Sequence, residues 1–218
     1  MFREILVGTK RRTLVHDAIE EVLGMLARTQ KMFEMVSRRM AAGGTPETED
    51  IEQEDDEINI GERMVRRMIF EHLALNPSQD LPASLALISV VHDVERIGDY
   101  CKSLIEIGQW SHVCSSDSRY GEMCRNLFTS ITPLFPQALE ALRESDADLA
   151  RQVMRQHEEI KAQTDQVFAV AMEDEEANRD TLLHALGARL LRRVSAHLSN
   201  VASSVANPLD RLGDDETT

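Results

Sequence analysis

The chain is poor in several residue types, and each shortage excludes a class of protein. Aromatic residues make up 4% of its 218 residues, and it has only 10 glycines and 6 prolines. Leucine, alanine, glutamate, arginine and methionine are abundant by contrast, and this composition favours helix. Alternation of the strand type never persists for more than a few residues. We therefore predict an all-α protein.

Cysteines and long apolar runs are also scarce. The three cysteines, Cys101, Cys114 and Cys124, form no Cys-x-x-Cys pair, which argues against a disulfide or zinc-ribbon framework and fits a reducing compartment. No apolar run reaches the roughly 18 residues needed to span a bilayer, and the N-terminus lacks the apolar stretch of a signal peptide. We expect a cytoplasmic protein without membrane insertion.

Basic residues are outnumbered, with 24 Lys and Arg against 38 Asp and Glu, which gives a formal charge of −14. Such a protein is a poor candidate for binding nucleic acid or an anionic membrane surface. The hydrophobic content of 42% nevertheless supports a folded core.

Helical periodicity covers nearly the whole chain and is interrupted at turn signals. The expected helices span roughly residues 13–42, 46–75, 80–110, 120–143, 146–172 and 178–206, and Pro133 and Pro136 should kink the fourth. We interpret the polar segment 112–119 as a linker between two domains, residues 1–113 and 114–218. The acidic end, residues 214–218, is expected to be disordered.

Two carboxylates flank the apolar face of the third expected helix. That face consists of Leu87, Val90, Val91, Val94, Ile97, Cys101, Leu104, Ile105 and Gly108. Glu95 and Asp99, one turn apart, fall just beyond its edge, with His92 beside them. An unpaired carboxylate is costly to desolvate there, so a bound cation or a salt bridge is required.

The second expected helix places Asp55, Asn59 and Glu62 on one line, at i, i+4 and i+7. If the second and third helices are antiparallel neighbours, this line meets Glu95 and Asp99. Carboxylate and amide oxygens suit Mg, Ca, Mn or Fe, and a nitrogen from His92 would shift the preference towards Fe or Zn.

A structural alternative requires no metal. In it Glu95 pairs with Arg96, Lys102 or Arg66, Asp55 is solvated, and His92 is a hydrogen-bonded interior histidine.

The two halves of the chain align as a repeat. Residues 96–103 of the third helix align with residues 193–200, and residues 55–59 of the second helix align with residues 157–161. Both matches occur in the same order.

These residues resemble the PhoU family of phosphate-regulation proteins. The string Glu95–Tyr100 matches the family's motif Glu-Arg-Ile-Gly/Ala-Asp-His/Tyr, and the resemblance covers nearly the whole chain. It implies two tandem three-helix bundles with a multinuclear Fe or Zn cluster on each. The ligands that it implies for the first repeat are Asp55, Asn59, Glu95 and Asp99.

The second repeat departs from the family pattern. Where the family has acidic residues, this chain has His157, Lys161, Arg192 and Ala196, while Arg193, His197 and Asn200 keep the motif. Our hypothesis is that Lys161 and Arg192 replace the metal electrostatically, pairing with leftover acids such as Glu158.

The resemblance implies a cytoplasmic regulator of phosphate uptake, signalling and homeostasis that performs no bond chemistry. Its expected partners are phosphate transporter components or a sensor histidine kinase, and a homodimer is an open possibility. Two alternatives are a metal-free helical adaptor or scaffold and a di-iron carboxylate enzyme. The second is disfavoured because no Glu-x-x-His motif occurs.

Overall fold

The computed structural model describes residues 2, 13–42, 49–108 and 117–207. Within these residues the regular structure consists of helices alone, which confirms the predicted all-α class. The principal helices are α2 (Leu14–Ala42), α3 (Glu49–Leu75), α4 (Leu81–Gly108), α5 (Arg119–Ile131), α6 (Leu134–Glu144), α7 (Ala147–Glu173) and α8 (Arg179–Ala206).

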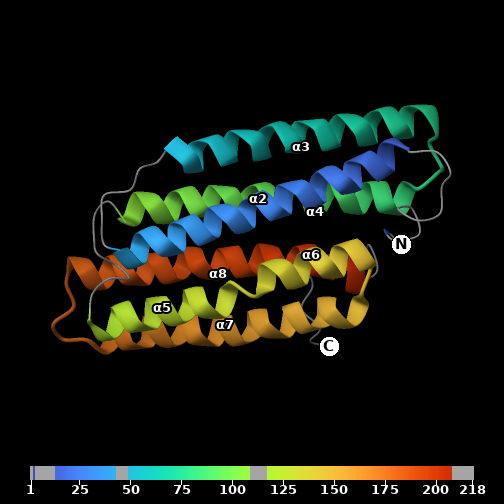
Figure 1. Cartoon of the computed structure of the whole chain (residues 1–218). Helices are drawn as coiled ribbons and strands as arrows, with labels where there is room; N and C mark the ends of the chain where they lie inside the picture. The colour runs from blue at the N-terminus through green and yellow to red at the C-terminus, as the bar shows by residue number, and fades with distance from the viewer. Residues whose placement is uncertain (1, 3–12, 43–48, 109–116, 208–218) are drawn as a thin grey trace.

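The helices form two bundles that lie side by side along their length (Figure 1). The first bundle contains α2, α3 and α4, and the second contains α7, α8 and the pair α5–α6, which together take the place of one helix. Helix α4 packs against α8, and α2 packs against α6, so the bundles share an extended interface. The predicted pair of tandem three-helix bundles is confirmed.

The helical break between α5 and α6 follows from the prolines. Pro133 separates the two helices, because proline cannot donate to the preceding turn and its ring clashes with it. Pro136 lies in the first turn of α6, where a backbone N–H has no helical acceptor, so the helix tolerates it. The kink expected near these residues is therefore a full break at the first of them.

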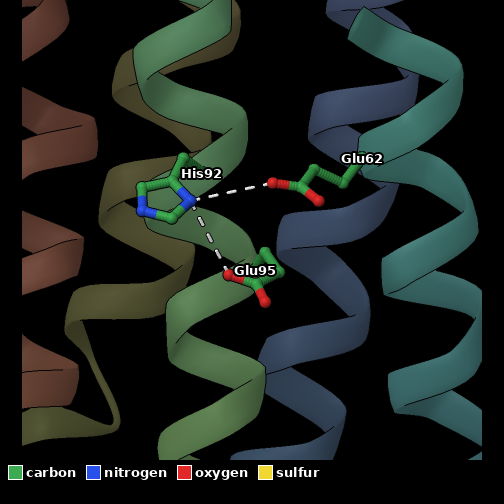
Figure 2. Close-up of side chains that lie close together, drawn as sticks. All are labelled: Glu62, His92 and Glu95. Atoms are coloured by element: carbon green, nitrogen blue, oxygen red, sulfur yellow. Dashed lines mark ion pairs between the residues drawn. The ribbon is translucent and has the colours of Figure 1, made fainter.

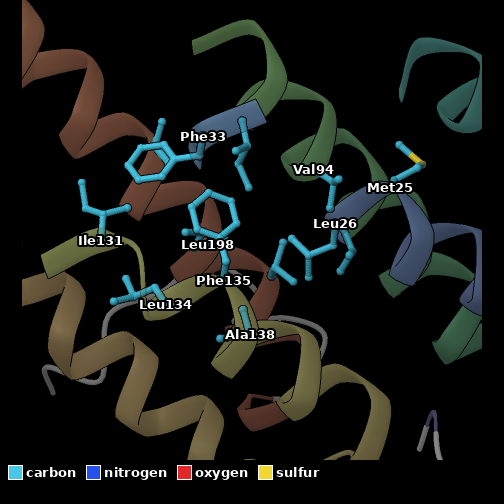
Figure 3. Packing of buried hydrophobic residues seen from close by; sticks show 14 of the residues in the cluster. Met25, Leu26, Phe33, Val94, Ile131, Leu134, Phe135, Ala138 and Leu198 are labelled. Carbon is cyan, nitrogen blue, oxygen red and sulfur yellow. The ribbon is translucent and has the colours of Figure 1, made fainter. Parts of the chain in front are cut away.

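A continuous hydrophobic core joins the bundles. The apolar face predicted for α4 is buried, from Leu87 to Ile105. Phe33 of α2 contacts two rings of the second bundle, with its ring centroid 5.1 Å from that of Phe128 and 5.1 Å from that of Phe135, which is labelled beside it in Figure 3. The two repeats therefore do not have separate cores.

Several predictions fall on parts of the chain outside the described residues. Most of the expected linker, the domain boundary after residue 113 and the acidic end at 214–218 lie there. Among the helices that the structure describes, none combines the length and the apolarity needed to cross a membrane.

Candidate functional site

The paired helices α3 and α4 carry all of the predicted metal ligands. Asp55 on α3 contacts Lys102 near the end of α4, whereas Glu62, two turns later on α3, contacts His92, which is earlier on α4. The two helices are thus antiparallel neighbours, as the predicted site required. Their facing polar side chains form two groups.

The first group is organised by a lysine. The Asp55 carboxylate is buried, and its Oδ2 accepts hydrogen bonds from Lys102 Nζ at 2.7 Å and from Asn59 Nδ2 at 3.0 Å. Lys102 Nζ also lies 3.4 Å from Asp99 Oδ1. An ammonium group therefore bridges two of the carboxylates that were predicted to bind metal.

The environment of Lys102 keeps its amine charged. Partial burial opposes the charge, but the hydrogen bond to Asp55 and the nearby charges of Asp55 and Asp99 outweigh it and raise the pKa of Lys102. A metal ion at this place would have to displace a favourably held cation.

The second group comprises Glu62, His92 and Glu95, and one donor atom from each lies within 4.8 Å of the others (Figure 2). His92 Nδ1 is 3.7 Å from Glu62 Oε1 and 3.8 Å from Glu95 Oε2. The two glutamate side chains are 15% and 17% exposed, and the histidine side chain is 48% exposed. The group is therefore half enclosed and open to solvent on the histidine side.

The negative charge of Glu95 is poorly compensated within this group. Its Oε2 is shielded from solvent and has no hydrogen-bond partner among the described residues, although Arg96 Nε lies 3.7 Å away. Burial, followed by the negative charges of Asp99 and Glu62, raises the pKa of Glu95. Binding of a cation would relieve this unfavourable burial of charge.

The structure divides the four predicted ligands between these groups. Asp55 and Asn59 bond to each other, Asp99 pairs with Lys102 and with Arg96 at 3.2 Å, and Glu95 faces the other group. Glu62 and His92 complete that group, and both were noted from the sequence as residues on the right helix faces.

The salt-bridge alternative is correct in part. Glu95 does lie near Arg96, but Arg66 pairs with Glu62 at 2.8 Å. Asp55 is buried and not solvated, and His92 is exposed and not interior. The interior position that this alternative gives His92 is therefore wrong, whereas its place beyond the edge of the apolar face of α4 is as expected.

At the equivalent place in the second repeat, a histidine and a serine meet. His157, which aligns with Asp55, has its Nδ1 2.9 Å from Ser195 Oγ. The Ser195 hydroxyl donates to the Arg192 carbonyl at 2.9 Å, so it accepts from the imidazole. Ser195 aligns with Gly98, where an added Cβ would lie 3.4 Å from Asp55 Oδ1. The two repeats thus bring together the same positions with different chemistry.

The basic residues of the second repeat pair with acids. Lys161 Nζ lies 3.0 Å from Glu158 Oε2, the pairing expected from the sequence, and Arg192 pairs with Asp165 at 2.7 Å. Both contacts are near the surface.

A polar network between α4 and α8 was not expected from the sequence. Asp93 Oδ1 accepts from Asn200 Nδ2 at 2.8 Å and lies 2.7 Å from His197 Nδ1. Tyr100 stacks on His197, and its hydroxyl accepts from Arg193 Nε at 3.1 Å. The motif residues that the second repeat keeps therefore hold the two repeats together, and their retention was the available signal.

Known proteins share this architecture. The family model described as the PhoU domain matches residues 22–108 and 126–205, one match in each bundle. The crystal structure of PhoU from Pseudomonas aeruginosa superposes with a TM-score of 0.78 at 22% identity, covering 88% of this chain and 95% of that one.

A second solved structure is similar to the same extent. The phosphate transport system regulatory protein PhoU from Streptococcus pneumoniae gives a TM-score of 0.77 at 18% identity, covering 94% of this chain and 98% of that one. No curated protein matches the chain. Because the family model matches most of the sequence, once in each repeat, this chain belongs to the PhoU family.

Proposed function

We propose that the chain is a cytoplasmic regulator of phosphate transport that acts by binding other proteins and catalyses no reaction. The observation that carries this proposal is the family match in both repeats, supported by the regulatory name of the Streptococcus relative. Phosphate transporter components or a sensor histidine kinase are the proposed partners. Long, rigid helix faces suit this role because they present a preformed surface.

We further propose that the first repeat binds Fe or Zn through Glu62, His92 and Glu95. Two carboxylates and an imidazole suit these metals better than they suit Mg or Ca, and Mn is intermediate. The Oε2 of Glu95, shielded from solvent and without a hydrogen bond among the described residues, is the structural observation that supports a cation there. The bound ion would cross-link α3 to α4 and so fix a partner-binding surface.

The remaining predicted ligands would join the metal only after Lys102 moved. Asp55, Asn59 and Asp99 already have partners, so a multinuclear cluster requires displacement of the amine. This same observation favours the second candidate function, a metal-free helical adaptor. In it Lys102 takes the place of the metal and links α4 to Asp55 of α3.

Metal analysis of the purified full chain separates the two candidates. We expect the parent protein to retain Fe or Zn, Glu95→Ala to lose it, and the control Arg192→Ala, altered at the aligned position of the second repeat, to retain it. Elemental analysis by mass spectrometry measures this directly. Equal metal in all three proteins, or none in the parent, would refute the metal site.

Partner binding tests the regulatory proposal separately. Purified chain should bind phosphate transporter components or the sensor kinase domain in a surface-immobilised assay, and Glu95→Ala should bind more weakly. If neither partner binds the parent protein, the regulatory proposal is wrong. If Glu95→Ala and a chelated parent both bind as tightly as the untreated parent, the metal-free adaptor is correct.

A further inference from the structure

The solvent side of helix α3 changes its chemistry halfway along the helix. In the first half the exposed side chains are mostly acidic, with Glu52 and Asp56 among them. In the second half they are mostly basic and apolar. We define the α3 outer face as five exposed side chains of the second half that lie on one side of the helix, at spacings of three and four residues: Ile60, Arg63, Met64, Arg67 and Phe70.

The apolar members of the α3 outer face are well exposed. Ile60, Met64 and Phe70 are 43%, 47% and 73% exposed. Helix α3 packs on α2 and α4 and is the outermost helix of the first bundle (Figure 1), so its far side has no large neighbour among the described helices. Aromatic residues, methionine and arginine are the types that protein interfaces favour over the rest of a protein surface. The α3 outer face therefore has the composition of an interaction surface.

The two arginines of this face have no carboxylate partner. Arg63 and Arg67 are exposed and form no ion pair among the described residues, whereas the neighbouring Arg66 pairs with Glu62 at 2.8 Å. One exposed acid, Glu71, follows Arg67 by about one turn without pairing with it in the part of the chain that the structure describes. The chain as a whole carries 38 acidic against 24 basic residues. The face is thus a local concentration of positive charge on an acidic protein.

This combination of side chains is complementary to an acidic amphipathic helix. Arginine binds carboxylates through two parallel hydrogen bonds, and the apolar side chains gain free energy when a partner removes them from water. From Ile60 to Phe70 the face is about 15 Å long, at about 1.5 Å per residue. About three turns of a partner helix, with its apolar residues flanked by Asp or Glu, can pack along this length.

The charge pattern of α3 disfavours an anionic membrane as the occupant. A helix that lies flat on a membrane brings its whole length to the lipid headgroups. The exposed acids Glu52 and Asp56 lie on the same side of α3 as Arg63 and Arg67, so they would be repelled by anionic lipid. A short partner helix contacts only the second half of α3 and avoids this repulsion.

We propose that the α3 outer face binds an acidic amphipathic helix of a regulatory partner protein. Apolar side chains of that helix contact Met64 and Phe70, and its carboxylates pair with Arg63 and Arg67. The inference rests on the proposed regulatory function and assigns to it a surface and a partner chemistry.

Binding of purified phosphate transporter components and of the sensor kinase domain tests this surface. For whichever component binds the parent, we expect Phe70→Ser, and separately the double variant Arg63→Gln/Arg67→Gln, to raise Kd at least about 10-fold. The double variant should also lose most of the salt dependence of binding, because its charges no longer attract the partner. Leu182→Ser on α8 and Arg155→Gln on α7 are the matched controls. They replace an exposed leucine and an exposed arginine elsewhere and should bind normally.

The results distinguish a wrong surface from a wrong function. If the parent binds none of these components, the proposed function fails and this inference fails with it. If the parent binds one of them and both α3 variants bind it equally well, only the surface is wrong. Circular dichroism, the thermal midpoint and the metal content of each variant establish that a weaker affinity reports on the surface alone.

Cross-linking from position 70 identifies the occupant of the face. With p-benzoylphenylalanine in place of Phe70, irradiation of the complex should attach the full chain to a partner segment that has helically spaced apolar residues and an excess of Asp and Glu. Mass spectrometry identifies that segment. A cross-link to a basic segment or to a second copy of this chain would overturn the proposal. Sedimentation of the parent, but not of Arg63→Gln/Arg67→Gln, with phosphatidylcholine vesicles containing about 30% phosphatidylglycerol would also overturn it, because an anionic membrane would then be the occupant.

Discussion

Asp55 and His157 occupy the same position in two copies of one helix pair, and each repeat satisfies its buried group differently. In the first repeat the buried carboxylate is neutralised by the Lys102 ammonium at 2.7 Å. In the second, His157 Nδ1 is hydrogen-bonded to the Ser195 hydroxyl at 2.9 Å. The buried carboxylate of the first repeat therefore faces a cation, whereas the imidazole of the second faces a hydroxyl group.

The comparison explains how the second repeat could lose its carboxylates and keep its fold. Two of its basic residues pair with acids near the surface, Lys161 with Glu158 on the same helix and Arg192 with Asp165 across α7 and α8. The motif residues that remain instead serve the contact with the first repeat, where Asp93 accepts from His197 and Asn200. The aligned positions of the two repeats thus serve different contacts, within the α3–α4 pair in the first repeat and between the repeats in the second.

The largest expected effect tests whether Lys102 holds the first repeat together. Lys102→Met leaves the buried Asp55 carboxylate without its cation, so the free energy of unfolding in chelator should fall by about 1–3 kcal/mol. Adding Zn or Mn should restore part of this loss, since Asp55 and Asp99 become available as ligands. Urea titrations with and without metal measure both effects.

Lys161→Met in the second repeat is the matched control. Its ion pair with Glu158 is near the surface, so the change in stability should be below about 0.5 kcal/mol. Equal effects of the two lysine variants would contradict the distinction drawn between the repeats.

A smaller effect is expected at the contact between the repeats. Asp93→Ala removes the acceptor shared by His197 and Asn200, and leaves two largely buried donors unpaired. We expect the free energy of unfolding to fall by about 1–2 kcal/mol, while the transition stays a single cooperative one because the core is shared. Calorimetry that showed two separate transitions in the parent would disprove the shared core.

The smallest effect is a pH dependence at Glu95. Because burial and neighbouring acids raise its pKa, the folded metal-free protein binds a proton there more tightly than the unfolded chain does. The ionised carboxylate therefore destabilises the fold, increasingly so as the pH rises from the ordinary glutamate pKa through the raised one.

Glu95→Gln removes this penalty and should stabilise the chelated protein by about 0.2–1 kcal/mol at neutral pH. The gain should vanish in acid below the ordinary glutamate pKa, where the parent carboxyl is also neutral. Urea titrations across this pH interval measure it, and a gain that is independent of pH would rule out the electrostatic cause.

Periodicity was sufficient to predict the helices and the facing of Asp55 towards α4, because burial repeats with the helical turn. The bridging position of Lys102 was not predictable in this way, since a long side chain can point to several neighbours of similar spacing. The contact between Asp93 and His197 joins residues 104 positions apart, and only the packing of α4 on α8 brings them together. The local sequence pattern therefore predicted the helices and the α3 side of the site, whereas tertiary packing determines which charged side chains meet.

The contact of Phe33 with two phenyl rings of the opposite bundle limits how the protein can move. Rotating the two bundles apart would expose three aromatic side chains to water at once, so hinge-like opening is energetically disfavoured. Helix α3, which packs only on α2 and α4 among its major neighbours, has no such anchor. In a conformational response to phosphate status, sliding or tilting of α3 would therefore cost the least free energy. The other helices would keep their positions.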